Sequence, residues 1–168
     1  MTDVERPTAT SSIEIEDADA ASDDARFCLA AYFAELAERF EEGFDPAKGV
    51  STHEPAMMPP HGCFLIVRLA GRPIGCAALR TLAPGLGEIK RMWVSPEARG
   101  LGIARRLLET LETRAREMGM DRVCLDTNRA LTRAQTLYRS AGYRPVERFN
   151  DNPYADFWFE KELAGNRG

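Results

Sequence analysis

The sequence predicts an α+β domain in which helices pack on one mixed β-sheet of about seven strands. Seven segments show apolar alternation or short apolar runs, which favour strands, and three show helical periodicity. Their order is strand, helix, three strands, helix, strand, helix and two strands, which is not the regular alternation of a doubly wound nucleotide-binding fold. With 168 residues, of which 44% are hydrophobic, the chain is long enough for one domain with one core.

The first half of the predicted domain contains a strand, a long helix, a long loop and a hairpin. Residues 12–16 alternate in polarity, which predicts a strand. Ser22 is a suitable N-cap for an amphipathic helix over 23–42, which Gly43 ends. Gly, Pro, Ser and both histidines then predict a loop over 44–61. Two apolar runs around Ala-Gly-Arg predict a hairpin with strands at 63–69 and 73–82.

The second half alternates strands with two further helices and closes on two strands. After a Pro-Gly turn, a strand is predicted at 88–94. Apolar residues from Leu101 to Met118 share one helical face, and Gly119 follows as a C-terminal cap. A second set of apolar residues at helical spacing, from Ala134 to Ala141, indicates another helix. The predicted helices are 101–118 and 131–141, and the predicted strands are 122–126, 143–149 and 157–163.

Composition narrows the class of protein. Residues 1–11 are polar and rich in Ser and Thr, which predicts a disordered tail before a single domain at 12–165. No apolar run approaches the roughly 18 residues that a membrane helix needs, and the N-terminus does not resemble a secretion signal. A formal charge of −4 argues against a nucleic-acid partner. We therefore expect a cytoplasmic protein with no membrane or nucleic-acid partner.

The thiols and imidazoles form no pattern that suggests a metal. The four cysteines are widely spaced and include no CxxC pair, so we expect reduced thiols. His53 and His61 lie in the predicted loop without a matching ligand cluster, so loop histidines are expected and no metal site is predicted. The cysteines are Cys28, Cys63, Cys76 and Cys124.

The most informative segment is a glycine turn that joins a predicted strand to a predicted helix. Glycine allows its backbone N–H groups to approach a ligand closely, and the first N–H groups of a helix lack partners within the helix. Such a turn favours anions, and flanking arginines add charge for phosphate oxygens. A loop that merely needs flexible glycines is the alternative. The turn lacks the residues of a P-loop or a dinucleotide fingerprint. It reads Arg99-Gly100-Leu101-Gly102-Ile103-Ala104-Arg105.

This turn resembles the Gln/Arg-x-x-Gly-x-Gly/Ala signature of the GNAT superfamily of acetyl-CoA-dependent N-acetyltransferases. A second segment, residues 134–143, resembles that family's Ala-x-x-Leu-Tyr-x-x-x-Gly-Phe/Tyr motif. Both lie at the expected places in the element order, and the resemblance covers roughly residues 12–163. It implies an α/β/α layered, GNAT-like acyl-CoA N-acyltransferase fold: a mixed, mostly antiparallel sheet with helices on both faces, and a homodimer is common in the family.

The resemblance also implies a site for acetyl-CoA. In the family, pantetheine lies in a V-shaped gap between the fourth and fifth strands. Main-chain groups of Met92, Trp93 and Val94 would bind the pantetheine arm, and the N–H groups from Gly100 to Arg105 would bind the pyrophosphate. Many relatives carry Asn where this chain has Leu131, and Asn128 is a nearby substitute for that cofactor contact.

Two residues are candidates for proton transfer. The family counterpart of Tyr138 points at the cofactor sulfur, so Tyr138 is the predicted acid that protonates the departing thiolate. The alternative for Tyr138 is a role in packing alone. Glu88 is the predicted base, because some members place a glutamate early in the same strand. The alternatives for Glu88 are an ion pair with Lys90 or Arg80 and a water molecule as the base. Strand alternation would place Glu88, Lys90, Met92 and Val94 on one face.

We therefore expect an enzyme that transfers acetyl from acetyl-CoA to the primary amine of a small molecule, amino acid or peptide, by direct attack in a ternary complex. No cysteine lies in a motif position, so a covalent acetyl-enzyme is not expected. The alternative is a catalytically silent acyl-CoA-binding regulatory module. The acceptor is expected between the first helix, the loop after it and the last strands, near Tyr32, Phe33, Phe40, residues 53–61 and residues 150–158.

Overall fold

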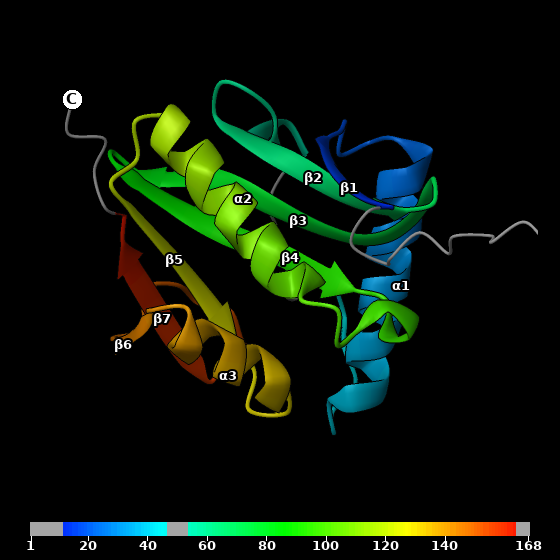
Figure 1. Cartoon of the computed structure of the whole chain (residues 1–168). Helices are drawn as coiled ribbons and strands as arrows, with labels where there is room; N and C mark the ends of the chain where they lie inside the picture. The colour runs from blue at the N-terminus through cyan, green and yellow to red at the C-terminus, as the bar shows by residue number, and fades with distance from the viewer. Residues whose placement is uncertain (1–11, 47–53, 164–168) are drawn as a thin grey trace, which may run out of the picture.

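The computed structural model describes residues 12–46 and 54–163, which form one seven-stranded sheet with helices on both faces (Figure 1). The strand order is β1-β2-β3-β4-β5-β7-β6, and every neighbouring pair is antiparallel except β4 and β5. The predicted mixed, mostly antiparallel sheet is therefore confirmed. The predicted tail, His53 and the last two residues of the predicted domain lie outside the described residues.

The observed elements follow the predicted order. The helices are α1 (Asp23–Arg39), α2 (Ile103–Glu117) and α3 (Thr132–Ser140). Short 3₁₀ turns lie at Glu54–Met57 and Pro96–Ala98. The strands are β1 (Ile13–Asp17), β2 (Gly62–Leu69), β3 (Arg72–Ala83), β4 (Leu86–Val94), β5 (Arg122–Thr127), β6 (Arg144–Val146) and β7 (Phe157–Glu162).

The two faces of the sheet carry separate cores. On one face, α2 and α3 pack against alternate residues of the central strands, such as Leu65 and Leu79. On the other face, α1 packs against the residues between them, such as Phe64 and Ala78. This alternation is the period of two expected of strands covered on both sides. Within the described residues, no helix is both long and apolar enough to span a membrane.

Strands β4 and β5 separate soon after they meet. Their parallel pairing covers only three positions, which are Leu86 with Arg122, Gly87 with Val123 and Glu88 with Cys124. Strand β4 continues to Val94 and β5 to Thr127 without further pairing between them. The edge of β4 beyond Glu88 therefore has no neighbouring strand among the described residues and borders a split in the middle of the sheet.

A bulge in β4 changes which side chains of the strand share one face of the sheet. Arg91 has a φ of 56°, and the pairing with β3 shifts between Cys76 and Ala78. An extra residue at this point reverses the alternation that follows it. Ile89 therefore packs on the α2 face together with Met92 and Val94, whereas Trp93 packs under α1. The expectation that Glu88, Lys90, Met92 and Val94 share one face is wrong.

Two element boundaries differ from the prediction by three residues, and the other boundaries differ by two residues or fewer. Helix α1 ends at Arg39 rather than 42, because Phe40 adopts an extended conformation and Gly43 a φ of 72°. The sixth strand spans Arg144–Val146 rather than 143–149. It is the edge strand and contains Pro145, which cannot donate to a ladder, so its pairing is short.

The buried thiols predict a loss of stability at alkaline pH. Burial raises the pKa of Cys63 and Cys124 from 9.0 to about 12. Below pH 9 the thiols are protonated in both states, so this contribution is fully present. Between pH 9 and 12 only the unfolded thiols ionise, so the free energy of unfolding should fall by up to about 1.4 kcal/mol per pH unit per thiol.

Urea unfolding at pH 8, 9 and 10 under reducing conditions measures this slope. A Cys63→Ala/Cys124→Ala variant should be less stable at pH 8 but should lose less stability than the wild type between pH 9 and 10. The raised pKa values of the buried tyrosines Tyr138 and Tyr143 add a further loss above pH 10, which the variant retains. If the free energy of unfolding fell equally with pH in both proteins, ionisation of Cys63 and Cys124 would not be the cause of the loss.

Candidate active site

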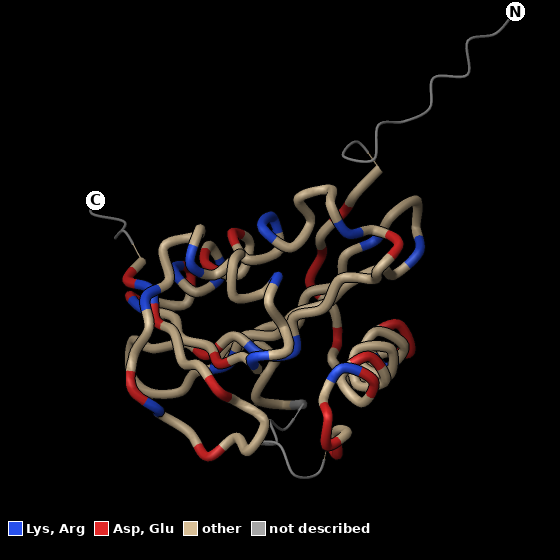
Figure 2. The backbone as a smooth tube through the Cα atoms, turned by 90° about the horizontal axis from the view of Figure 1, so that it is seen from below, with Lys and Arg blue, Asp and Glu red and all other residues tan. Residues whose placement is uncertain are grey.

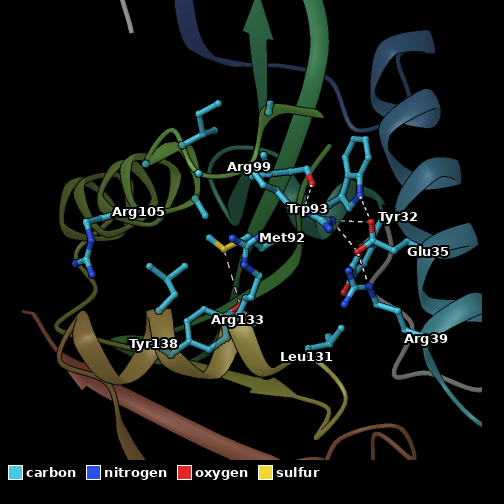
Figure 3. Close-up of a pocket in the computed structure, with 18 of the residues that line it drawn as sticks. Tyr32, Glu35, Arg39, Met92, Trp93, Arg99, Arg105, Leu131, Arg133 and Tyr138 are labelled. Carbon is cyan, nitrogen blue, oxygen red and sulfur yellow. Dashed lines mark hydrogen bonds and ion pairs between the residues drawn. The ribbon is translucent and has the colours of Figure 1, made fainter. Parts of the chain in front are cut away.

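A cavity of about 350 Å³ lies at the split between β4 and β5. Its walls come from α1, the end of β4, the glycine turn, the start of α2 and helix α3 (Figure 3). Of the predicted cofactor residues, those lining it are Met92, Trp93, Val94, Arg99, Gly100, Gly102, Ile103, Ala104, Arg105 and Tyr138. The two exceptions are Leu101, which is 39% exposed, and Asn128.

The glycine turn presents backbone donors to this cavity. Gly100 and Gly102 have φ values of 87° and 74°, a region that favours glycine. A Cβ atom built on either residue would meet no other heavy atom within 4 Å, so the space beside them is open. Within the described chain, the N–H groups from Gly100 to Arg105 have no backbone acceptor. Helix α2 thus begins with free donors and no side-chain cap, which suits an anion.

Arg99 lines the cavity and also pairs with a carboxylate of α1. Its Nη2 donates to both carboxylate oxygens of Glu35 at 2.6 and 2.7 Å, and its Nε donates to the Val94 carbonyl at 3.0 Å. Glu35, on α1, also contacts Arg39 at 3.1 Å and accepts from Trp93 Nε1 at 3.4 Å (Figure 3). This cluster therefore connects α1 to the glycine turn, and the Arg99 charge is already partnered.

Two other arginines border the same cavity. Arg105 donates from Nη2 to Ser140 Oγ at 2.6 Å, which holds its guanidinium between α2 and α3 (Figure 3). Arg133, in the first turn of α3, also lines the cavity. Both lie near the free donors of the turn, so positive charge surrounds the place where phosphate oxygens would bind.

Tyr138 lies where the two sides of the split meet. It is 7% exposed, and its hydroxyl is 3.9 Å from Met92 Sδ across the gap from α3 to β4. Burial, and secondly the charge of Asp126, raise the pKa of Tyr138 above its usual value. The hydroxyl therefore keeps its proton at neutral and mildly alkaline pH, as a proton donor must.

Glu88 is brought to the base of the split and not to the wall of the cavity. It is fully buried and pairs with Arg80 Nε at 2.7 Å and with Lys90 Nζ at 3.5 Å. Asn150 Nδ2 donates to Glu88 Oε2 at 3.2 Å and to Asp126 Oδ2 at 2.6 Å. Glu88 thus has the ion pairs expected of its structural alternative. It reaches a neighbouring cavity directly through Lys90 and, by way of Asn150, through Asp126.

Asn128 supports a loop. Its Nδ2 donates to the Tyr154 carbonyl at 2.6 Å, and its Oδ1 accepts from Ala130 N at 2.8 Å. Leu131, at the position where many family members carry Asn, lines the 350 Å³ cavity directly. The polar atoms of Asn128 are therefore engaged within the chain, and its contact with the cofactor stays a prediction.

A second cavity of about 140 Å³ adjoins the first. The two share Tyr32, Met92, Leu131 and Tyr138 among their walls. Phe33 and Phe40 also line the second cavity, as expected of an acceptor site beside the first helix. Its other aromatic walls are Phe44 and Tyr154.

Two carboxylates of this site were not given specific roles by the sequence. Glu35 lies four residues before Arg39 and three after Tyr32, which places the three side chains on one helix face. Asp126 lines the second cavity, held by the amides of Asn150 and Asn152. Its location at the carboxyl end of the strand beside the split was the available signal.

Comparison with known proteins identifies the family. The model of the acetyltransferase (GNAT) family matches residues 26–143. An IAA acetyltransferase of Azospirillum brasilense is 42% identical over 104 residues, which cover 60% of this chain and 67% of that protein. An uncharacterized N-acetyltransferase of Schizosaccharomyces pombe is 36% identical over 97 residues, which cover 56% of this chain and 60% of that protein.

The fold agrees with the sequence comparison. The crystal structure of a GNAT family acetyltransferase from Elizabethkingia anophelis, with acetyl-CoA bound, superposes with a TM-score of 0.64. It is 18% identical, and the superposition covers 90% of this chain and 99% of that chain. The sheet split beside a glycine turn, together with a family match over more than half of the sequence, establishes that the chain belongs to the GNAT family of N-acetyltransferases.

Proposed function

We propose that this protein transfers acetyl from acetyl-CoA to the primary amine of a small molecule, an amino acid or a peptide, by direct attack in a ternary complex. The observation that carries the proposal is the pair of adjoining cavities at the β4–β5 split, which meet at Tyr138. One cavity has the free donors of the glycine turn and the other has aromatic walls and a carboxylate. Such an arrangement suits two substrates that react at their common boundary.

The residues of the first cavity fit coenzyme A. The open space beside Gly100 and Gly102 and the free N–H groups that follow them suit a pyrophosphate. Arg105 and Arg133 supply positive charge at its border. The edge of β4 beyond Glu88, which does not pair with β5, offers main-chain groups of Met92, Trp93 and Val94 to an amide-containing arm.

The transfer exchanges one bond for another. The neutral amine nitrogen forms a bond to the thioester carbonyl carbon, the carbon–sulfur bond breaks, and the sulfur leaves with the electron pair. Tyr138 gives its hydroxyl proton to that sulfur and regains a proton from solvent. The amine loses its extra proton to a base. All four cysteines are buried, which is consistent with direct attack and not with an acetyl-cysteine intermediate.

Thiol release from acetyl-CoA with a broad panel of primary amines tests this function, with mass spectrometry of the acetylated product. Product with any amine supports catalysis, and loss of that product in Tyr138→Phe assigns it to this site. Binding of acetyl-CoA without acetylation of any amine would instead support the silent acyl-CoA-binding module.

Glu88 is our candidate for the proton acceptor, acting through water. If so, Glu88→Gln should lower kcat/KM most at acidic pH, where neutral amine is scarce, and should move the acidic limb of the pH profile. The measurement is kcat/KM from pH 6 to 9, with Glu109→Gln on the exposed face of α2 as the control. A lowered melting temperature with an unchanged pH profile would assign Glu88 to its ion pairs with Arg80 and Lys90 and leave water as the base.

A further inference from the structure

The second cavity combines an aromatic wall with charges of both signs, and no feature of the proposed reaction requires that combination. Its size is about 140 Å³. A cavity of roughly 150 Å³ with apolar walls accommodates a benzene ring. The chemistry of its lining therefore bears on which amine the enzyme accepts.

The apolar end of the cavity is built from mutually packed rings of three separate segments. Phe33 on α1 stacks on Phe44 at 5.5 Å between centroids, and Phe44 lies 4.8 Å from Tyr154. Phe40 contacts both Phe44 and Tyr154, at 5.9 and 5.7 Å. The Tyr154 hydroxyl accepts from Asp45 N–H at 2.8 Å, which ties the segment after α1 to the loop before β7. This wall favours an aromatic or branched apolar group.

The anionic part of the cavity is Asp126. Val123 and Leu125 pack in the core under α2, so alternation along β5 places Asp126 on the α1 face. Its two carboxylate oxygens accept from Asn150 Nδ2 at 2.6 Å and from Asn152 Nδ2 at 3.2 Å. Neutral amides orient the carboxylate without cancelling its charge. Burial is the main cause of the raised pKa values of Tyr138 and Tyr32, and the charge of Asp126 raises both further.

The cationic part consists of Lys90 and Arg91, which follow each other at the β4 bulge. Lys90 Nζ faces Glu88 at 3.5 Å, so much of its charge is compensated from behind. The Arg91 guanidinium carbon lies 5.9 Å from the centroid of Phe33, at the border of the aromatic wall. Because the left-handed conformation of Arg91 interrupts the alternation of β4, Arg91 and Met92 both line this cavity.

We propose that the acceptor is an α-amino acid with an aromatic or branched apolar side chain, bound as its zwitterion. Asp126 binds its ammonium group, Arg91 binds its carboxylate, and the Phe33–Phe40–Phe44–Tyr154 wall receives its side chain. This inference rests on the proposed function, because it names the substrate of the same site. An amine that lacks the carboxylate would lose the charge-assisted hydrogen bond to Arg91, and such bonds are stronger than those between neutral groups.

The test compares three acceptors, each missing at most one feature: L-phenylalanine, phenethylamine without the carboxylate, and L-alanine without the ring. The wild-type kcat/KM for L-phenylalanine should exceed that for either other compound by at least about tenfold. Arg91→Gln should reduce the preference over phenethylamine to about threefold or less, chiefly by lowering kcat/KM for L-phenylalanine. Glutamine is a suitable replacement, because Arg91 has a positive φ and this conformation is most strained for residues that branch at Cβ.

Asp126→Asn should raise KM about tenfold or more for L-phenylalanine and phenethylamine alike, with KM for acetyl-CoA unchanged. Matched controls are Asp151→Asn in the exposed loop and Arg144→Gln on the edge strand, neither of which lines a cavity. Equal wild-type use of all three acceptors would overturn the acceptor class while the acetyltransferase function stands. Acetylation of no amine at all would instead remove the proposed function.

Discussion

Gly102→Asp is expected to weaken coenzyme A binding at least about 100-fold. Gly102 is the N-cap of α2, and its φ of 74° is a conformation that aspartate tolerates better than most residues. No protein atom fills the space that its Cβ would enter, so the unliganded chain should still fold. The added carboxylate would repel phosphate and compete for the N–H groups of the first turn. The loss of two charge-assisted hydrogen bonds accounts for the magnitude.

Gly119→Asp is the matched control for this variant. Gly119 follows the other end of α2, has a φ of 84°, and likewise has open space around a built Cβ. Both variants thus carry the same backbone strain and the same added charge. Calorimetric titration of coenzyme A should show wild-type affinity for Gly119→Asp and a large loss for Gly102→Asp, with matching circular dichroism spectra. Wild-type affinity in both would show that pyrophosphate binds elsewhere.

The fold was largely predictable, because its elements carry strong periodic signals. The apolar stripe of α2 through Leu107, Leu111 and Ala115 is buried as the helical spacing predicts, whereas Leu101, expected on the same face, precedes the helix and is exposed. Both faces of β2 and β3 are covered, and their sequences are accordingly apolar runs. The order of the elements and the seven strands therefore follow from local patterns.

The bulge at Arg91 was not predictable from local pattern. Its register shift appears only in the pairing of β4 with β3, and no glycine marks it. Cys76, on β3, donates its Sγ–H to the Arg91 carbonyl at 3.3 Å, so a contact 15 residues distant in the chain supports the bulge. Such support is tertiary, which is why strict alternation assigned Glu88 and Met92 to the same face.

The candidate site shows the same division between local and tertiary information. The glycine turn and the segment with Tyr138 are continuous motifs, and the structure brings both to one cavity. The partners of charged side chains depend on distant segments: Arg99 is 64 residues from Glu35, and Asp126 is 24 residues from Asn150. Nothing local in the sequence revealed the carboxylate of Glu35 that α1 places against Arg99, and a phosphate contact of Arg99 stays a prediction.

The exposed carboxylates near α1 are poorly placed to select the amine acceptor. Figure 2 shows acidic positions along α1 and the segment that follows it. Glu38, Glu41 and Glu42 are exposed there, whereas Glu35 is engaged by Arg99 and Arg39. Exposed charges are screened over roughly 10 Å at 0.1 M salt. We therefore expect the choice of amine to depend on the charged residues that line the second cavity.

Tyr138→Phe is expected to lower kcat by about 10²- to 10⁴-fold, the usual contribution of a general acid, with little change in the affinity for acetyl-CoA. The ring would keep its place beside Phe159 at 6.1 Å and Tyr143 at 6.0 Å, so packing is preserved and only the hydroxyl is lost. Because the pKa of Tyr138 is raised, its ionisation should not lower the wild-type rate below about pH 10. Steady-state kinetics from pH 6 to 10 and calorimetry with acetyl-CoA measure both quantities.

Tyr143→Phe is the control for Tyr138→Phe, because the two tyrosine rings pack together but only Tyr138 is the proposed acid. The Tyr143 hydroxyl donates to the buried carboxylate of Glu112 at 2.8 Å, and Tyr143 lines neither cavity of the active site. Its removal should lower the free energy of unfolding by about 1–3 kcal/mol, because a buried charged acceptor loses a donor, while kcat stays near the wild-type value. Tyr138→Phe should show the reverse pattern, since within the described ranges the only hydrogen-bond partner of its hydroxyl is the Met92 sulfur at 3.9 Å. Wild-type turnover in Tyr138→Phe on a good acceptor would reduce Tyr138 to a packing residue and leave the thiolate to be protonated by water.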